Sequence, residues 1–250
     1  MSKAPKGMYK VAIEVCRPVA KILTKPHWSG QENLPTGQPF IVVVNHVTEF
    51  DPFVIMHFLA DEGHAVRALA KDSLFRVPLL KHVFTSTKMV PVYRGTNAAG
   101  DALKYAKLAI SEGESIAIFP EGTLTQDPEL WPMKFKTGAA RLALSTGAPV
   151  IPLAQWGGHK VLHRWRNSIP KLGKRHDTWV VAGPPIDLSD LNHDENDREA
   201  VLEATRRMHT TLTRMVEEIR GETAPEQPWD PKLNAYPPAE PGNSEPTNHD

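Results

Sequence analysis

Short apolar runs alternate with segments of helical periodicity along most of the chain. An apolar run bounded by turn residues is typical of a buried strand, whereas apolar residues at steps of three and four indicate a helix. The predicted strands are residues 40–44, 66–70, 88–92, 115–119, 150–156 and 178–182. The predicted helices are residues 52–60, 98–112, 137–146 and 198–220. This alternation predicts a single α/β domain in which helices flank a central β-sheet.

The two ends of the chain differ from its middle. Residues 1–27 contain apolar positions of an amphipathic helix together with an excess of lysine and arginine. From Gly221 onward the sequence is rich in Pro, Glu and Asn, with few residues that can form a core. We therefore predict an N-terminal basic segment (1–27), a folded domain (28–220) and a disordered, proline-rich tail (221–250).

Composition and charge narrow the class of protein. The chain has 250 residues, 40% of them apolar, and a mean hydropathy of -0.36, values of a globular rather than an integral membrane protein. Charged residues and Pro18 interrupt residues 11–23, which therefore cannot span a bilayer as a simple apolar helix. The net charge of +0 argues against nucleic-acid binding. No secretory signal follows the basic start, and Cys16 is the only cysteine, so we expect a cytoplasmic protein without intramolecular disulfides.

His46 follows the predicted strand 40–44, and ligands in α/β sheets gather where strands end and helices begin. On a continuous helix, the step of five between His46 and Asp51 would separate their side chains by about 140°, so they can meet only if the chain turns. Pro52 favours that turn and predicts Asp51 as the N-cap of the next helix. A cap carboxylate has spare lone pairs with which it can also orient a histidine N–H.

Other roles for His46 stay open at this point, including that of a purely structural histidine. A nucleophilic triad is disfavoured because no Gly-x-Ser-x-Gly motif occurs and Cys16 lies in the amphipathic segment. A metal site is not expected either, since His46, His57 and His64 lack the close spacing of zinc ligands.

Three further groups of residues follow predicted strands. Pro120 to Thr123 form a glycine-containing turn after residues 115–119, whose N–H groups and hydroxyl suit a phosphate or a polar glycerol head. Lys71 and Arg94 follow the strands 66–70 and 88–92, and Arg94 can pair with phosphate in a bidentate way. The alternatives are an ordinary turn and two exposed surface cations.

Taken in order, these blocks resemble the motifs of the glycerolipid acyltransferases, and most closely the bacterial 1-acylglycerol-3-phosphate branch. The resemblance covers about residues 28–185 and rests on the order and spacing of its blocks. They are Asn45-His46 through Asp51-Pro52, Lys71 through Arg94, Phe119 through Thr123, and Val150 through Gly157.

The resemblance implies an enzyme that transfers a fatty acyl group from a thioester, acyl-CoA or acyl carrier protein, to a lysolipid hydroxyl without a cofactor or an acyl-enzyme. It implies that His46 is the general base, oriented by Asp51. It also implies that Glu121, Gly122, Thr123, Arg94 and Lys71 hold the acceptor. Many relatives continue the Glu-Gly-Thr motif with Arg-Ser, whereas Leu124 and Thr125 follow here, so a cation expected near the acceptor is missing from that place.

A lipid acceptor implies contact with a bilayer, and residues 8–25 combine apolar and basic positions. We expect this segment to be an interfacial anchor on an anionic membrane surface, peripheral on the inner face of the cell membrane. The alternative is a terminal helix packed on its own domain.

Three other functions are consistent with the pattern. They are acylation of a different lysophospholipid or glycolipid, lipid binding without turnover on the same fold, and hydrolysis of the thioester.

Overall fold

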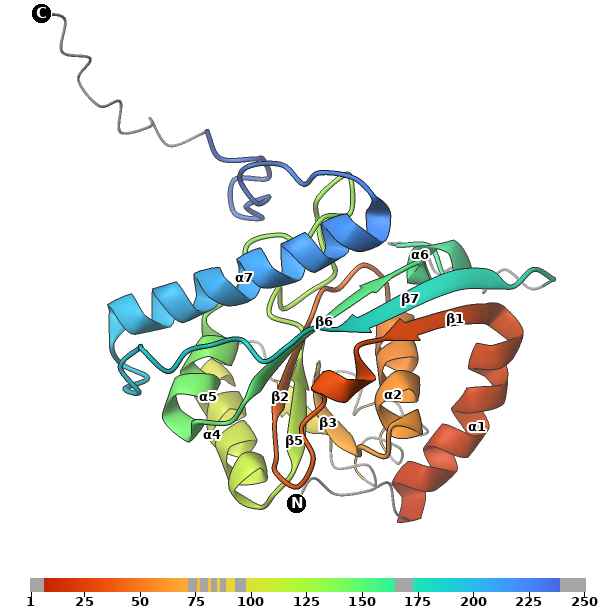
Figure 1. Ribbon diagram of the computed structural model, residues 1–250, viewed down its shortest axis with the longest axis horizontal. Helices are drawn as coiled ribbons and strands as arrows, with labels where there is room; N and C mark the ends of the chain where they lie inside the picture. Colours follow the sequence, from red (N-terminus) through yellow and green to blue (C-terminus); the bar gives the residue numbers. More distant parts are fainter. Residues whose placement is uncertain are drawn as a thin grey trace, which may run out of the picture.

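The computed structural model describes residues 7–71, 76, 81, 85, 89–92, 98–164 and 173–238 (Figure 1). The described residues form a seven-stranded sheet with the order β1-β7-β6-β2-β5-β3-β4. The strands are β1 (Thr24–Ser29), β2 (Ile41–Val44), β3 (Val66–Lys71), β4 (Val90–Val92), β5 (Ser115–Ile118), β6 (Val150–Trp156) and β7 (His176–Ala182). The helices are α1 (Gly7–Leu23), α2 (Asp51–Asp61), α4 (Ala98–Ser111), α5 (Gly138–Thr146), α6 (Gly158–Val161) and α7 (Arg198–Arg220), with a short 3-10 turn at Gln31–Asn33. The predicted α/β class is confirmed.

The direction of the strands decides where the site lies. β3, β5, β2 and β6 run parallel to one another, and within the described sheet only β6 and β7 pair in an antiparallel way. The carboxyl ends of these four parallel strands therefore lie at one edge of the sheet. The segments that follow β2, β5 and β6 all begin at that edge.

Helices cover both faces of the sheet, and each face has its own core. Ile41 and Val43 pack with α4, α5 and α7, while Val42 and Val44 pack with α2 on the other face. All four side chains are 0% exposed. Since successive side chains of a strand point to opposite faces, a strand buried on both faces reads as an unbroken apolar run.

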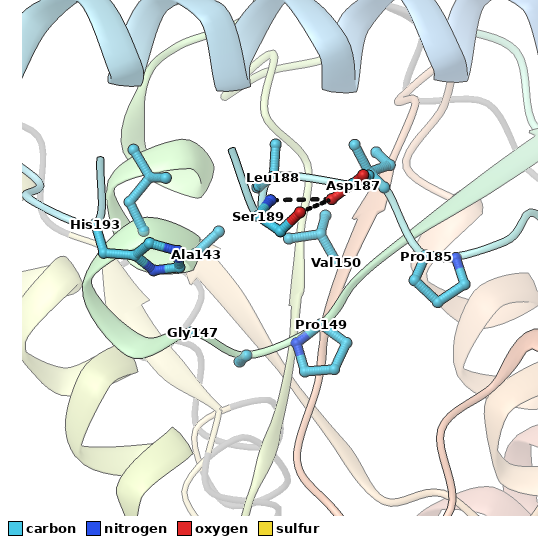
Figure 2. Close-up of a pocket in the computed structure, with 12 residues that line it drawn as sticks. Ala143, Gly147, Pro149, Val150, Pro185, Asp187, Leu188, Ser189 and His193 are labelled. Atoms are coloured by element: carbon cyan, nitrogen blue, oxygen red, sulfur yellow. Dashed lines mark hydrogen bonds between the residues drawn. The ribbon is translucent and has the colours of Figure 1, made fainter. Parts of the chain in front are cut away.

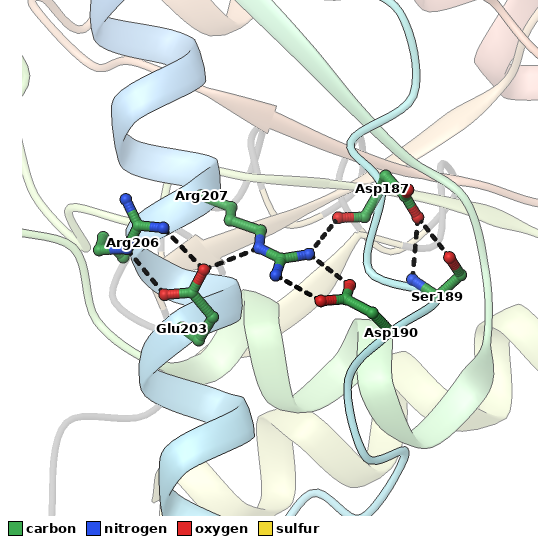
Figure 3. A network of polar contacts seen from close by, with 6 residues as sticks. All are labelled: Asp187, Ser189, Asp190, Glu203, Arg206 and Arg207. Atoms are coloured by element: carbon green, nitrogen blue, oxygen red, sulfur yellow. Dashed lines mark hydrogen bonds and ion pairs between the residues drawn. The ribbon is translucent and has the colours of Figure 1, made fainter.

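Helix α7 lies across the first of these faces, with the bounds that the periodicity predicts, and ends at Gly221 in a left-handed conformation. Arg207 fixes it to the segment that follows β7 (Figure 3). Its Nη1 and Nη2 donate to Asp190 Oδ1 and Oδ2 at 2.5 and 2.7 Å, and its Nε donates to Glu203 Oε1 of the same helix at 2.8 Å. The bidentate pair with Asp190 connects α7 to the segment that follows β7.

The N-terminal part of the chain corrects one predicted boundary. Residues 24–29 form β1, an edge strand parallel to β7, so the division expected between residues 27 and 28 falls inside a strand. The strand was missed because its sequence is polar: of its side chains only Thr24 is buried, and Pro26 is tolerated because the strand lies at the edge.

Helix α1, which precedes β1, packs on α2. The Tyr9 hydroxyl donates to the Val66 carbonyl at 2.9 Å. None of the helices within the described ranges combines the length and the apolar character needed to cross a membrane.

Residues 221–238 correct a second boundary, because they pack on the domain instead of beginning a disordered tail. The Lys134 N–H donates to the Trp229 carbonyl at 3.0 Å, and the Tyr236 hydroxyl donates to Asp127 Oδ2 at 2.6 Å. The few aromatic residues of this proline-rich stretch supply the packing, with Trp229 and Tyr236 in edge contact at 5.1 Å between ring centroids. Residues 239–250 lie outside the described part of the chain.

Candidate active site

His46 and Asp51 meet at the carboxyl end of β2. His46 Nδ1 lies 3.1 Å from Asp51 Oδ2, and the aspartate side chain is fully buried, whereas the histidine side chain is 16% exposed. The five-residue step closes because the chain turns through residues 47–50 before α2 begins. The structure thus brings together the two residues that the sequence predicts as the catalytic pair.

Asp51 does not cap α2 as predicted, because the cap position belongs to Phe50. Its Oδ2 instead accepts the N–H groups of Val47 and Thr48 at 2.6 and 2.8 Å, in addition to its contact with His46. Both N–H groups belong to the turn that precedes α2. The Asp51 carboxylate supplies the acceptor for these two donors. One oxygen atom therefore holds both the turn and the imidazole.

The second oxygen of Asp51 faces the start of α6. Oδ1 is buried and has no hydrogen-bond partner among the described residues. A methyl group on Gly158 would lie 2.7 Å from it, closer than real carbon contacts, so this position next to the carboxylate requires glycine. The end of β6 is thus built to accommodate Asp51.

Glu121 supports His46 from inside the protein. It is 2% exposed; Oε1 accepts the His46 N–H at 2.7 Å, and Oε2 accepts the Met133 N–H at 3.2 Å. Burial raises the pKa of its carboxyl to about 8, although these N–H donors act in the opposite direction. The sequence analysis placed Glu121 at the acceptor. In the structure its carboxylate positions the His46 backbone instead, since both oxygens are used internally.

The ring of His46 is held on a second side by Phe119, with ring centroids 4.1 Å apart and an angle of 28° between planes. With Nδ1 toward Asp51, Nε2 has no hydrogen-bond partner within the described part of the chain. An imidazole whose Nδ1–H is donated to a carboxylate carries its free lone pair on Nε2. The geometry therefore suits proton abstraction at Nε2 from a bound hydroxyl.

Asn45 and Gln155 join the ends of β2 and β6, a contact that the sequence analysis missed. Asn45 Nδ2 donates to the Gln155 carbonyl at 3.0 Å, and Asn45 Oδ1 accepts the Gln155 N–H at 2.9 Å. Both side chains are 1% exposed. This reciprocal pair fixes the residue before His46 to the neighbouring strand.

The remaining predicted site residues differ in what the structure shows of them. Gly122 and Thr123 follow β5 at the same edge, and the turn is closed by the Gly122 N–H, which donates to the Phe119 carbonyl at 2.9 Å. Gly122 has a φ of 74°, which favours glycine. Lys71 ends β3 at this edge, but its side chain lies outside the described atoms, as does all of Arg94.

A pocket of about 410 Å³ lies elsewhere, around the start of β6 and the end of α5 (Figure 2). Its lining includes Val150, the first residue of β6, and His193. His46 and Asp51 lie at the carboxyl ends of the strands, so this pocket is not part of the candidate active site.

The order of the motifs has a match among known proteins. Residues 25–156, more than half of the chain, match the family model described as Acyltransferase. The chain belongs to the acyltransferase family. The resemblance noted from the sequence is confirmed.

Individual relatives of this acyltransferase carry more specific names. One is the chloroplastic 1-acyl-sn-glycerol-3-phosphate acyltransferase BAT2 of Brassica napus, 31% identical over 159 residues that cover 63% of this chain and 44% of that protein. Another is the 1-acyl-sn-glycerol-3-phosphate acyltransferase of Borreliella burgdorferi, 33% identical over 127 residues that cover 50% of this chain and 48% of that protein. The acyltransferase chain thus spans about half the length of these relatives, or less.

A solved structure shows the same fold as this acyltransferase. The crystal structure of the 1-acyl-sn-glycerophosphate (LPA) acyltransferase PlsC from Thermotoga maritima aligns with a TM-score of 0.62. The alignment covers 86% of this chain and 83% of that one at 22% sequence identity.

Proposed function

We propose that the protein transfers a fatty acyl group from an acyl thioester to the free hydroxyl of 1-acylglycerol 3-phosphate, which gives phosphatidic acid. The observation that carries this proposal is the His46–Asp51 pair, with Nε2 unpaired at the carboxyl edge of the sheet. The family match and the names of the relatives support the reaction class and the acceptor.

In the proposed mechanism His46 Nε2 takes the proton of the acceptor hydroxyl as its oxygen attacks the thioester carbonyl. Asp51 keeps the imidazole in orientation and stabilises the imidazolium that forms. The tetrahedral intermediate collapses with cleavage of the carbon–sulfur bond, and the imidazolium returns the proton to the leaving thiolate. The products are the ester and a free thiol, so no cofactor is needed.

The donor in this proposal is acyl-CoA or an acylated carrier protein, and the acceptor reaches the enzyme from an anionic membrane surface on the cytoplasmic side. Two features of α1 support membrane contact: Val11 is 51% exposed and Ile22 is 67% exposed. Lys10 and Lys21 are exposed on the same helix. Apolar side chains next to lysines are typical of a helix that lies in the interface of an anionic bilayer.

The test measures thiol release and lipid product with both donors, in the presence and absence of a panel of lysolipids. We expect release that depends on 1-acylglycerol 3-phosphate and falls roughly 10²- to 10⁴-fold in His46→Ala, because a positioned base contributes that much. His193→Ala is the matched control, since His193 is exposed and remote from the pair. Equal activity in His46→Ala would refute the role of His46 as the general base. Preference for another lysolipid would show that the proposed acceptor is wrong. Thiol release without any acceptor would indicate a thioester hydrolase.

A further inference from the structure

Lys136 lies over the turn that follows β5, although it comes well after that turn in the sequence. Its backbone N–H donates to the Pro120 carbonyl at 2.8 Å. A methyl group on Gly122 would lie 2.8 Å from Cε and 3.0 Å from Cδ of Lys136, and closer still to Nζ. The exposed lysine therefore places its ammonium directly against Gly122, beside Thr123.

Other described cations near this turn are already engaged. Lys134 pairs with Asp230 at 2.8 Å, and Arg164 donates to the carbonyls of Thr125 and Asp127 at 2.7 and 2.6 Å. Arg220 stacks on Trp131 and Trp156, at 3.6 and 4.4 Å from the ring centroids.

Lys136 differs from these cations. Within the described part of the chain its ammonium makes no ion pair with a carboxylate. It is therefore available to an anionic ligand.

The turn beneath Lys136 is connected directly to His46. The Thr125 N–H donates to the His46 carbonyl at 2.7 Å, and Glu121 accepts the His46 N–H. In 1-acylglycerol 3-phosphate only two carbons and one oxygen separate the attacking oxygen from the phosphorus. A phosphate whose neighbouring hydroxyl reaches His46 must therefore bind close to the histidine. The phosphates of coenzyme A are separated from the thioester by the whole pantetheine arm.

We propose that Lys136, together with the Thr123 hydroxyl, binds the phosphate of the acceptor and so supplies the cation that Leu124 does not. An ammonium and a hydroxyl are suitable donors for a phosphate monoester, which carries close to two negative charges at neutral pH. Thr123 is partly exposed, and the described residues offer its hydroxyl no hydrogen-bond partner. Leu124, by contrast, is 8% exposed and faces the interior. This inference rests on the proposed function for the identity of the acceptor.

The experiment compares Lys136→Ala and Lys136→Arg with the native chain. We expect the KM for 1-acylglycerol 3-phosphate to rise roughly 10- to 100-fold in Lys136→Ala, as for loss of a charged hydrogen bond, with kcat and the donor KM little changed. Lys136→Arg should restore most of the loss because the charge remains. Lys104→Ala is the matched control, since Lys104 is an exposed lysine on α4 that belongs neither to this turn nor to the loop that carries Lys136.

A turnover-free measurement separates this inference from the proposed reaction. Glycerol 3-phosphate should bind to the native chain in calorimetry and bind roughly 10-fold or more weakly to Lys136→Ala. Weakened binding in a protein without acyl transfer would support the phosphate site and refute the proposed function. The role of Lys136 would be overturned by an unchanged acceptor KM or by unchanged glycerol 3-phosphate binding. A rise confined to the donor KM would also overturn it, because Lys136 would then bind the phosphates of the donor.

Discussion

Glu121 shows at the scale of single residues how a buried acid can hold the backbone of two distant segments. Its two oxygens connect the backbone of His46 to that of Met133, so it links the turn that contains His46 to the loop that carries Lys136. Burial is the largest cause of its raised pKa. The group therefore keeps its proton in the folded chain over a pH range in which the unfolded chain has lost it.

This difference predicts a pH dependence of stability. The pKa of Glu121 rises from 4.5 in the unfolded chain to about 8 in the folded chain. The contribution of this group to the free energy of unfolding is therefore fully present below pH 4.5 and is lost as the pH rises toward 8. The free energy of unfolding of the native chain should thus fall, relative to Glu121→Gln, between about pH 5 and pH 8 and then level off.

Urea unfolding of both proteins across this range checks the prediction. Glu129→Gln, at an exposed glutamate, is the control and should show no such slope. A difference between native and Glu121→Gln that is constant with pH would contradict the assignment.

The sequence predicts part of this site and misses the rest for a physical reason. His46 and Asp51 are local: a strand end, a five-residue step and Pro52 are enough to bring them together. The depth of Glu121 and the position of Lys136 depend on contact between the turn after β5 and residues 131–136. No periodicity along the chain encodes that contact, and only the folded arrangement shows which carboxylate faces inward.

At the scale of elements, α1 has one buried face and one exposed apolar face. Tyr9, Ala20 and Leu23 are buried, whereas Val11 and Ile22 are exposed. Eleven residues advance a helix by three turns plus about 20°, so Val11 and Ile22 lie on one face, and Tyr9 and Ala20 lie together on another. The two roles considered for this segment, docking on the domain and membrane contact, therefore use opposite sides of one helix.

This division makes point substitutions a sharper test of membrane binding than deletion of residues 1–25, because that deletion would remove Tyr9 and the first two residues of β1. We expect Val11→Glu and Ile22→Glu each to weaken flotation with anionic vesicles roughly 10-fold or more, since each loses an apolar side chain to the interface. Leu202→Glu on α7 is the control, because Leu202 is 50% exposed on a different helix. Unchanged flotation, with an unchanged melting temperature, would remove α1 as the anchor.

The central elements were predictable from the sequence and the peripheral ones were not. β2, β5 and β6 are buried on both faces, so their apolar runs identify them directly, and α7 has an unbroken apolar stripe ended by Gly221. β1 and residues 221–238 lie at the edges of the molecule, where polar composition is compatible with a strand or an ordered segment as well as with a loop. Their order comes from partners distant in sequence, such as β7 and Asp127.

At the scale of the whole molecule, the C-terminal segment braces the loop behind the active site. Tyr236 and Trp229 bind Asp127 and Lys134, on either side of Met133, whose N–H holds Glu121. Asp127 is 0% exposed, so the Tyr236 hydroxyl satisfies a buried carboxylate. A chain of contacts therefore runs from residues 229–236 through the loop to the backbone of His46.

Truncation after residue 223 should break this chain of contacts while leaving every residue of the proposed catalytic pair in place. We expect a lower melting temperature and a fall in kcat because the brace positions His46, together with a rise in the acceptor KM because the same loop carries Lys136. Tyr236→Phe should show the same pattern in milder form, with about 1–3 kcal/mol lost from the free energy of unfolding when the buried carboxylate loses its partner. Truncation after residue 238 keeps the described contacts and serves as the control. If truncation after residue 223 lowers stability but leaves kcat unchanged below the melting temperature, the segment stabilises the domain without positioning His46.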